Sequence, residues 1–208
     1  HQREKTVKKL ILVFLSWTLF ASAPSVLEAR LTPKRSVLEN GIVLLTSEER
    51  ALPMITLNLL IKAGSRYDSQ GREGLANLAA RLLTYGTRSR TALQISEELD
   101  FIGAGLSTGC SEELATVSLT LLKKDLDVGL NLLADVLTAS VFPPEEIDRQ
   151  KKSVIASIRA RDEEPGAIAQ AKFLEALFPG SPYGRPVEGT EGAVERMERA
   201  ELVEFHGR

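Results

Sequence analysis

Hydrophobic and polar residues alternate along two segments of the chain, in the pattern of strands. Residues 54–62 place Ile55, Leu57, Leu59 and Ile61 at alternate positions, with Thr56, Asn58 and Lys62 among the residues between or after them. Residues 115–121 repeat the pattern with Ala115, Val117, Leu119 and Leu121. A period of two sends successive side chains to opposite faces of a sheet. Each segment therefore predicts a strand with one buried face.

A turn signal lies upstream of these strands, between two apolar runs in residues 36–49. Its centre is Asn40-Gly41, a dipeptide that accepts the positive φ angles of a tight hairpin turn. We therefore expect a β-hairpin that is followed by the strand over residues 54–61.

The other segments follow the period of helices. Apolar residues three or four positions apart predict helices over residues 73–85, 92–102 and 126–139, within 143–165 and over about 166–177, with short helices near 190–205. Thr91 and Gln94 are spaced as a capping box, and Pro144 suits a first helical turn. The expected buried stripes are Leu75, Leu78 and Leu82; Ile95, Leu99 and Ile102; and Ile147, Val154, Ile155 and Ile158.

Hairpin strands combined with separate helix pairs indicate the α+β class. We expect a mostly antiparallel sheet with helices packed on one face. A doubly wound parallel sheet is disfavoured, because strands and helices do not alternate regularly and no phosphate-binding loop follows a strand. The glycines of residues 64–74 fit a polar connection that enters a helix better than a phosphate cradle.

The first residues have the pattern of a secretory signal. Basic residues at positions 3, 5, 8 and 9 precede residues 10–23, which carry no charge. Fourteen residues are short for a bilayer span, so residues 1–29 are interpreted as a cleaved signal peptide, with several possible cleavage sites, rather than a permanent anchor. We expect a secreted or periplasmic protein that touches a membrane only if the signal stays uncleaved. Residues 30–208 would form one domain that continues past Arg208.

Composition excludes several functions. The 208 residues are 43% hydrophobic and 26% charged, which is typical of a globular domain, and the net charge of −2 disfavours nucleic acid as a partner. A single cysteine, Cys110, excludes an intrachain disulfide and is interpreted as a small buried residue rather than a reactive thiol. The two histidines, His1 and His206, are too few for a histidine-based zinc site, and His206 is expected at the solvated surface.

Seven segments together resemble one known family. In chain order, between residues 36 and 205, they are NGIVLLTSE, LIKAGSRYD, GLANLAARLLTYGT, ELDFIGAGLS, LATVSLTLL, SVIASIRARDEEP and PYGRPVEGTE. Their order and spacing are similar to the N-terminal domain of the pitrilysin/insulinase zinc metallopeptidases, which include processing-peptidase subunits and cytochrome bc core proteins. The resemblance implies an α+β domain that is duplicated along the chain and helps to enclose a chamber for unfolded peptides.

The resemblance also shows what the chain lacks. Active members carry a His-x-x-Glu-His helix that corresponds to residues 77–81, where two histidines hold zinc and the glutamate acts as base. Here Asn77 and Arg81 stand in place of the histidines, Ala80 in place of the base, and Ser157 in place of a glutamate ligand. The resemblance therefore implies neither a metal site nor a catalytic residue in this chain, and no cofactor.

Two main hypotheses about function follow. The first is a non-catalytic subunit that pairs, as a heterodimer, with an active histidine-bearing relative, so that zinc is expected only in the partner and unfolded peptides are held between them. The alternative is a structural or peptide-binding scaffold that resembles the bc core proteins. An active zinc endopeptidase is disfavoured by the four substitutions. Arg81 is either a peptide contact or a solvated cation on a helix face.

Overall fold

The computed structural model describes residues 33–208, so the expected signal peptide over residues 1–29 lies outside the described residues. The described part of the chain divides into two compact units, a first that ends at Leu52 and a second over Pro53–Arg208. Within the described range, no helix is long and apolar enough to cross a membrane.

The first unit contains the expected hairpin. Strand β1 (Lys34–Val37) pairs in antiparallel fashion with β2 (Val43–Thr46). Gly41 has a φ of +84°, which a side chain at this position would disfavour, and the Asn40 Oδ1 accepts a hydrogen bond of 3.2 Å from the backbone N–H of Ile42. The turn prediction is thereby confirmed.

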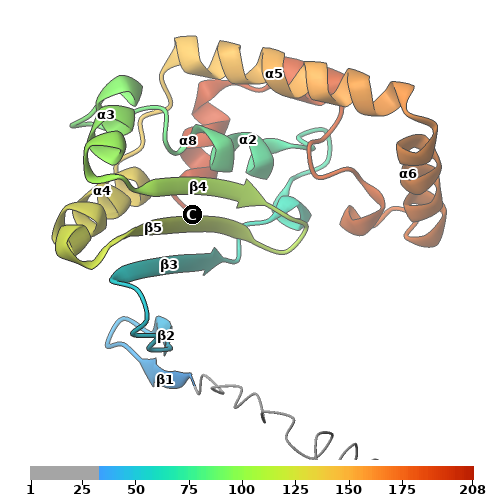
Figure 1. The fold of residues 1–208 in the computed structure, drawn as a ribbon. Helices are drawn as coiled ribbons and strands as arrows, with labels where there is room; N and C mark the ends of the chain where they lie inside the picture. The colour runs from blue at the N-terminus through green and yellow to red at the C-terminus, as the bar shows by residue number, and fades with distance from the viewer. Residues whose placement is uncertain (1–32) are drawn as a thin grey trace, which may run out of the picture. The chain divides into compact units, whose positions relative to one another are not determined.

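The second unit is built on a sheet with the strand order β3–β5–β4 (Figure 1). Its strands are β3 (Met54–Ile61), β4 (Gly105–Cys110) and β5 (Ala115–Leu122), and both pairings are antiparallel. The sequence pattern did not predict β4, because GLSTGC offers one large apolar residue and two glycines. The strand forms through backbone pairing with β5, from Gly105 opposite Thr120 to Cys110 opposite Ala115.

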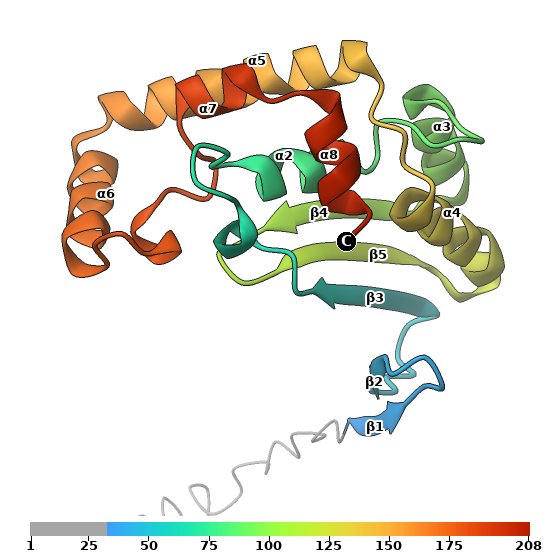
Figure 2. The ribbon, with the colours of Figure 1, turned by 180° about the vertical axis from the view of Figure 1, so that it is seen from behind.

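Helices cover one face of this sheet, as Figures 1 and 2 show from opposite sides. The α-helices are α2 (Leu75–Leu82), α3 (Ala92–Ile102), α4 (Leu126–Thr138), α5 (Pro144–Glu163), α6 (Pro165–Leu177), α7 (Glu191–Arg196) and α8 (Arg199–His206). Short 3-10 turns are η1 (Ser65–Tyr67), η2 (Lys123–Asp125) and η3 (Pro182–Gly184). The predicted α+β class is confirmed, and so is the capping box of Thr91 and Gln94 at the start of α3.

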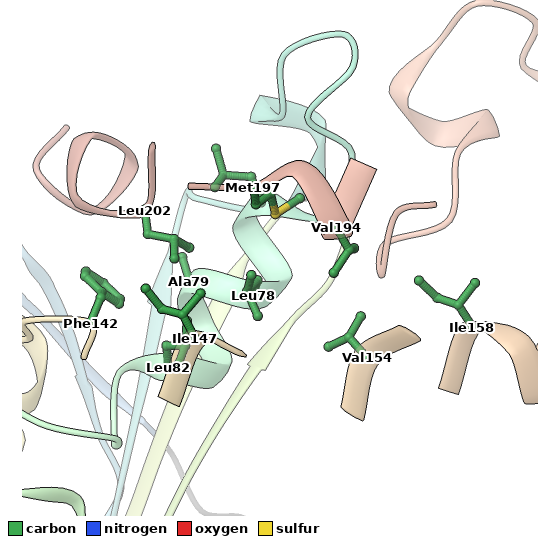
Figure 3. Packing of buried hydrophobic residues seen from close by; sticks show 11 residues of the cluster. Leu78, Ala79, Leu82, Phe142, Ile147, Val154, Ile158, Val194, Met197 and Leu202 are labelled. Atoms are coloured by element: carbon green, nitrogen blue, oxygen red, sulfur yellow. The ribbon is translucent and has the colours of Figure 1, made fainter. Parts of the chain in front are cut away.

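Two apolar clusters hold the second unit together. One joins the sheet to α3 and α4 through Ile95, Leu119, Leu132 and Val136. The other packs α2 against α5, α7 and α8 (Figure 3) and contains Leu75, Leu78, Ala79, Leu82, Phe142, Ile147, Val154, Ile158, Val194, Met197 and Leu202. The predicted helical stripes lie in these clusters except for Ile102, which is buried but belongs to neither cluster, and Leu99 and Ile155 are only partly buried. Helix α2 is therefore the central element of the second cluster.

Two single residues behave differently from their expected roles. The expectation that His206 is solvated is wrong, because its ring is partly buried, meets the Phe142 ring edge-on and hydrogen-bonds the carbonyl of Leu137 at 2.8 Å. Cys110 is only partly buried, and its thiol donates to the carbonyl of Ser111 at 3.3 Å. Burial still raises the pKa of this thiol to about 12, so it is a poor nucleophile at neutral pH.

Candidate functional site

Helix α2 is enclosed on nearly every side. It packs against β4, β5, α5 and α8, and the exposed fraction is 8% for Asn77 and 4% for Ala80. Of the three α2 positions that correspond to the family metal site, only Arg81, which is partly exposed, reaches solvent. Asn77 and Ala80 are therefore enclosed, because small residues at positions 76, 79 and 80 let the neighbouring elements close around the helix.

The start of α2 is fixed by close backbone contact with a later loop. Gly74, with φ +96°, and Gly189, with φ +80°, lie against each other's neighbouring peptide groups. A Cβ atom at Gly189 would come within 2.0 Å of the carbonyl oxygen of Glu73, so no side chain fits there. Arg185 of the same loop reaches Glu73 with a distance of 3.1 Å between Nη1 and Oε1. The contact between Gly74 and Gly189 joins two of the segments that resemble the peptidase family.

A buried carboxylate caps the same helix end, and sequence reasoning missed it. Asp68, with an exposed fraction of 6%, accepts backbone hydrogen bonds from Gly74 at 2.8 Å and from Ala76 at 2.9 Å. These N–H groups belong to the first turn, where a helix lacks internal acceptors. Burial raises the pKa of Asp68 to about 6, although the two hydrogen bonds and Arg185 act in the opposite direction. The pattern of polar residues in 64–74 gave no sign that this one is buried.

Asn77 is a buried amide whose Nδ2 has no hydrogen-bond partner among the described residues. A buried donor without a partner costs roughly 1–3 kcal/mol, so packing rather than polar contact holds this side chain. Ser157, on α5, is exposed, and its hydroxyl donates to the carbonyl of Ser153 at 3.1 Å. The Ser157 hydroxyl is therefore hydrogen-bonded within α5.

The residues at these positions do not fit a zinc ion. They offer one amide, one hydroxyl and no thiolate, imidazole or carboxylate, while the guanidinium of Arg81 adds a permanent positive charge. Over residues 33–208, no group of three or more His, Cys, Asp or Glu side chains is placed to hold a metal ion. No chemical step through zinc is derived for this chain.

None of the ion pairs formed within residues 33–208 involves Arg81. Its neighbours in sequence on α2 are apolar, and it extends from the last turn of the helix. A guanidinium with free donors can bind a carboxylate in a bidentate manner.

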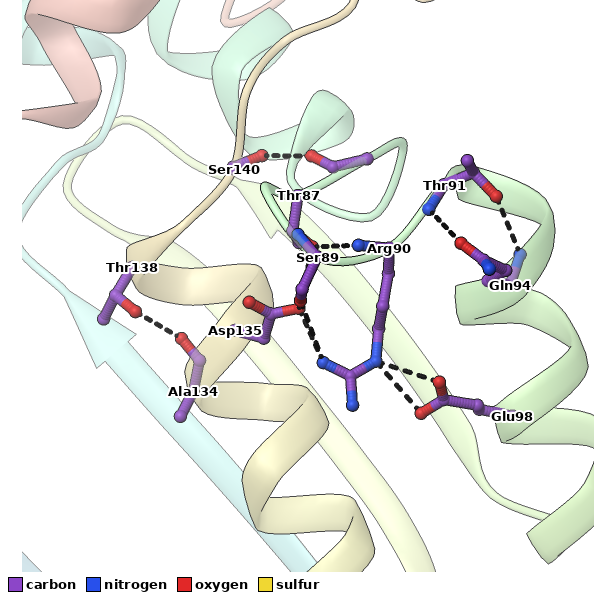
Figure 4. Close-up of polar contacts among 11 residues, drawn as sticks. Thr87, Ser89, Arg90, Thr91, Gln94, Glu98, Ala134, Asp135, Thr138 and Ser140 are labelled. Carbon is purple, nitrogen blue, oxygen red and sulfur yellow. Dashed lines mark hydrogen bonds and ion pairs between the residues drawn. The ribbon is translucent and has the colours of Figure 1, made fainter.

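A polar network fixes the loop that follows α2 (Figure 4). Asp135 on α4 accepts hydrogen bonds of 2.7 Å from each of Thr87, Ser89 and Arg90, and Arg90 also binds Glu98 on α3 at 3.0 Å. Partial burial alone would raise the pKa of the Asp135 carboxyl, but these three donors lower it below its usual value. The network thus ties α3 and α4 to the end of α2.

A cavity of about 700 Å³ lies beside the loop that contacts α2. Its charged side chains form ion pairs with one another or with nearby groups: Glu73 with Arg185, Arg161 with Glu188, and Lys172 with Glu175. The remaining lining includes Ile168, Ala171, Phe178 and Pro186. The cavity has room for a side chain or short peptide segment, but it presents no unpaired charge that would select a ligand.

Comparison with known proteins gives the family context of this geometry. The family model described as Insulinase (Peptidase family M16) matches residues 43–191. The chain is 31% identical over 173 residues to an uncharacterized zinc protease of Rickettsia bellii, covering 83% of the chain and 42% of the relative. It is 27% identical over 173 residues to cytochrome b-c1 complex subunit 1 of Bos taurus, covering 83% of the chain and 36% of that protein.

Solved structures agree with this fold. A peptidase M16 inactive domain from Pseudomonas fluorescens superposes with a TM-score of 0.81 at 26% identity, covering 85% of the chain and 43% of that structure. A protease from Helicobacter pylori has the same fold, with a TM-score of 0.77 at 19% identity over 85% of the chain and 43% of that structure. The chain thus spans less than half the length of the relatives that it matches.

Proposed function

Because the chain belongs to the insulinase family of peptidases, family M16, we propose that it is a non-catalytic member that pairs with a histidine-bearing relative. The two chains together would form a chamber that holds unfolded peptides while the relative cleaves them. In this proposal the relative alone binds zinc, and this chain forms part of the chamber surface that contacts the peptide.

The observation that carries the proposal is the replacement of the metal-binding helix face without loss of the helix. Helix α2 keeps its apolar stripe in the core, with Leu78 and Leu82 both fully buried. The positions that correspond to ligands and base are Asn77, Ala80 and Arg81, which offer no zinc donor set. A helix that packs in the core but offers no zinc ligands is what the non-catalytic half of a paired peptidase requires.

The sheet face opposite the helices supports the peptide-holding part of the proposal. In the second unit this face carries hydroxyl and amide groups: Thr56 and Thr120 lie 3.2 Å apart between their Oγ1 atoms, and Ser118 donates to the Oδ1 of Asn58 at 2.8 Å. Hydroxyl and amide groups on a hydrated surface can form hydrogen bonds, directly or through water, with many peptide sequences without strong selectivity for one of them. On the helical side, Arg81 would bind a peptide carboxylate or an acidic side chain.

A scaffold role is the second candidate, and one observation favours it. The chain is similar to a subunit of the cytochrome b-c1 complex as well as to named zinc proteases. A scaffold would use the same intact packing of α2 and would need no partner with histidines. Fold alone does not separate the two roles.

The test is a cleavage assay with the full-length protein. A histidine-bearing member of the family from the same organism is produced separately, and each protein is incubated alone and together with unfolded peptides, with and without a chelator. We expect cleavage only when the relative is present, more cleavage in the mixture, and loss of it with the chelator. Chelator-sensitive cleavage by this chain alone would overturn the proposal, and a mixture that neither associates nor gains activity would favour the scaffold role.

Export is part of the same proposal. The basic start and the uncharged residues 10–23 would direct the chain out of the cytoplasm, so the pair would act in the periplasm or outside the cell. Fractionation of cells that express the tagged full-length protein, with the mature N-terminus determined by sequencing, tests this. A cytoplasmic protein with an uncut N-terminus would contradict it.

A further inference from the structure

Helix α2 carries two hydrogen-bond donors on one side. Asn77 and Arg81 are four positions apart, so their side chains are neighbours on the same side of the helix. The exposed fraction of Asn77 is 8%, and its Nδ2 has no hydrogen-bond partner among the described residues. Arg81 is partly exposed, and none of the ion pairs within residues 33–208 involves it.

Helix geometry directs these two donors toward each other. Long side chains on a helix lean toward its N-terminus and cover the turn before their own. The guanidinium of Arg81 is thereby directed toward the turn that carries Asn77. Ala80, a further residue on this side of α2, adds only a methyl group and no acceptor. An acceptor that binds Arg81 is therefore brought to the Asn77 amide as well.

We propose that Asn77 and Arg81 form a carboxylate-binding site in the position that corresponds to the metal site of active family members. One oxygen of the ligand accepts from the guanidinium and the other accepts from the Asn77 amide, so both donors gain a charged acceptor. The ligand is an acidic side chain or the C-terminal carboxylate of an unfolded peptide. The position that binds a cation in active members thus selects an anion in this chain.

The buried amide distinguishes this site from a single surface arginine. An exposed guanidinium alone binds carboxylates weakly, because water competes for its donors. The Nδ2 of Asn77 is already desolvated, so a ligand oxygen that reaches it adds a hydrogen bond without a further desolvation cost at this donor. The partly exposed Arg81 side chain changes rotamer within nanoseconds, and its movement admits the ligand. Ser157 adds no third donor, because its hydroxyl donates to the Ser153 carbonyl.

The first experiment measures peptide binding to the full-length protein by isothermal titration calorimetry. Four acetylated, unfolded peptides share one sequence that has no other acidic residue, and they combine a central Glu or Gln with a free or amidated C-terminus. We expect a peptide with a carboxylate to bind about tenfold or more tightly than the peptide with none, since a hydrogen bond to a charged group is worth about this factor. The effective carboxylate identifies the source of the ligand, whereas equal affinities, or no binding, overturn the proposal.

The second experiment repeats these titrations with variants of the two donors. Asn77→Leu should abolish the preference for a carboxylate while the melting temperature rises, because the variant removes an unpaired buried donor. A purely structural role of Asn77 would not couple these two changes. Arg81→Gln should also abolish the preference, and Arg81→Lys should retain only part of it, because lysine lacks the planar guanidinium fork.

Arg88→Gln is the matched control. Arg88 is an exposed arginine in the loop after α2, so its replacement removes the same charge outside the proposed site. The control should keep the preference for a carboxylate. A preference that survives Asn77→Leu overturns the two-donor site, and equal losses in Arg81→Gln and Arg88→Gln overturn it because they would reflect net charge alone.

The inference rests on the proposed function only in taking peptides as ligands, and the two fail in different ways. The titrations use this chain alone, so they do not require a histidine-bearing relative. Carboxylate-selective binding by a chain that does not pair would overturn pairing and leave the site intact. Peptide binding without any preference for a carboxylate would overturn the site and leave the peptide-holding role intact.

Discussion

Replacing Asp68 by asparagine is expected to remove a pH dependence of stability that one buried carboxylate imposes on the start of α2. In the folded chain, burial raises the pKa of Asp68 to about 6, against an ordinary value of 3.8. The folded state therefore binds this proton more tightly than the unfolded state. The contribution to stability is fully present below about pH 4 and is lost as the pH rises through about 6.

The magnitude follows from the two pKa values. One pKa unit corresponds to about 1.4 kcal/mol, so the gap between about 6 and 3.8 sets an upper bound of roughly 3 kcal/mol. Asparagine stays neutral and keeps one oxygen for the N–H groups of Gly74 and Ala76, so it removes the pH dependence with little loss of packing. The free energy of unfolding of the wild type minus that of Asp68→Asn should fall by about 2–3 kcal/mol from pH 4 to pH 7.

The assay is urea unfolding followed by circular dichroism at several pH values between 4 and 7. Subtracting the variant from the wild type cancels the other titrating groups. Asp127→Asn, at an exposed aspartate of α4, measures how much pH dependence follows from removing any aspartate. A difference between wild type and Asp68→Asn that is flat over this range, or that rises with pH, would refute the assignment of Asp68 as a buried cap with a raised pKa.

Three further changes test the packing around α2. Gly189→Ala should lower the free energy of unfolding by more than about 3 kcal/mol, because the added Cβ would meet the carbonyl oxygen of Glu73. Gly103→Ala is the control and should lower it by only about 1 kcal/mol, because Gly103 has a φ of +62° but open space around it. Chemical denaturation of both variants measures the difference. Asp135→Ala should cost about 2–4 kcal/mol in the same measurement, since it leaves three donors without their acceptor, and a loss below 1 kcal/mol would contradict the network. Asn77→Leu should raise the melting temperature, because it removes a buried amide donor that has no partner; a lower melting temperature would imply a polar contact at Asn77.

The sequence determined most of the elements, because their signals are local. Alternation predicted β3 and β5, a capping box predicted the start of α3, and Asn40-Gly41 predicted the hairpin turn. The sequence did not predict strand β4, because GLSTGC shows no alternation of apolar residues. The segment becomes a strand through the pairing of its backbone with β5. The residue types alone also showed that the positions corresponding to the family metal site carry no zinc ligands, because the side chain itself determines whether a residue can bind zinc.

Only the tertiary structure decided which polar residues are enclosed. Asp68 and Asn77 look like ordinary surface residues in sequence, yet both are more than nine-tenths buried, since elements distant in the chain close over them. Conversely, α6 reads as an ordinary apolar helix, and only its position in the fold leaves Phe173 and Leu177 facing solvent. The physical reason is that periodicity reports which side of an element is apolar, whereas burial depends on what other elements bring to that side.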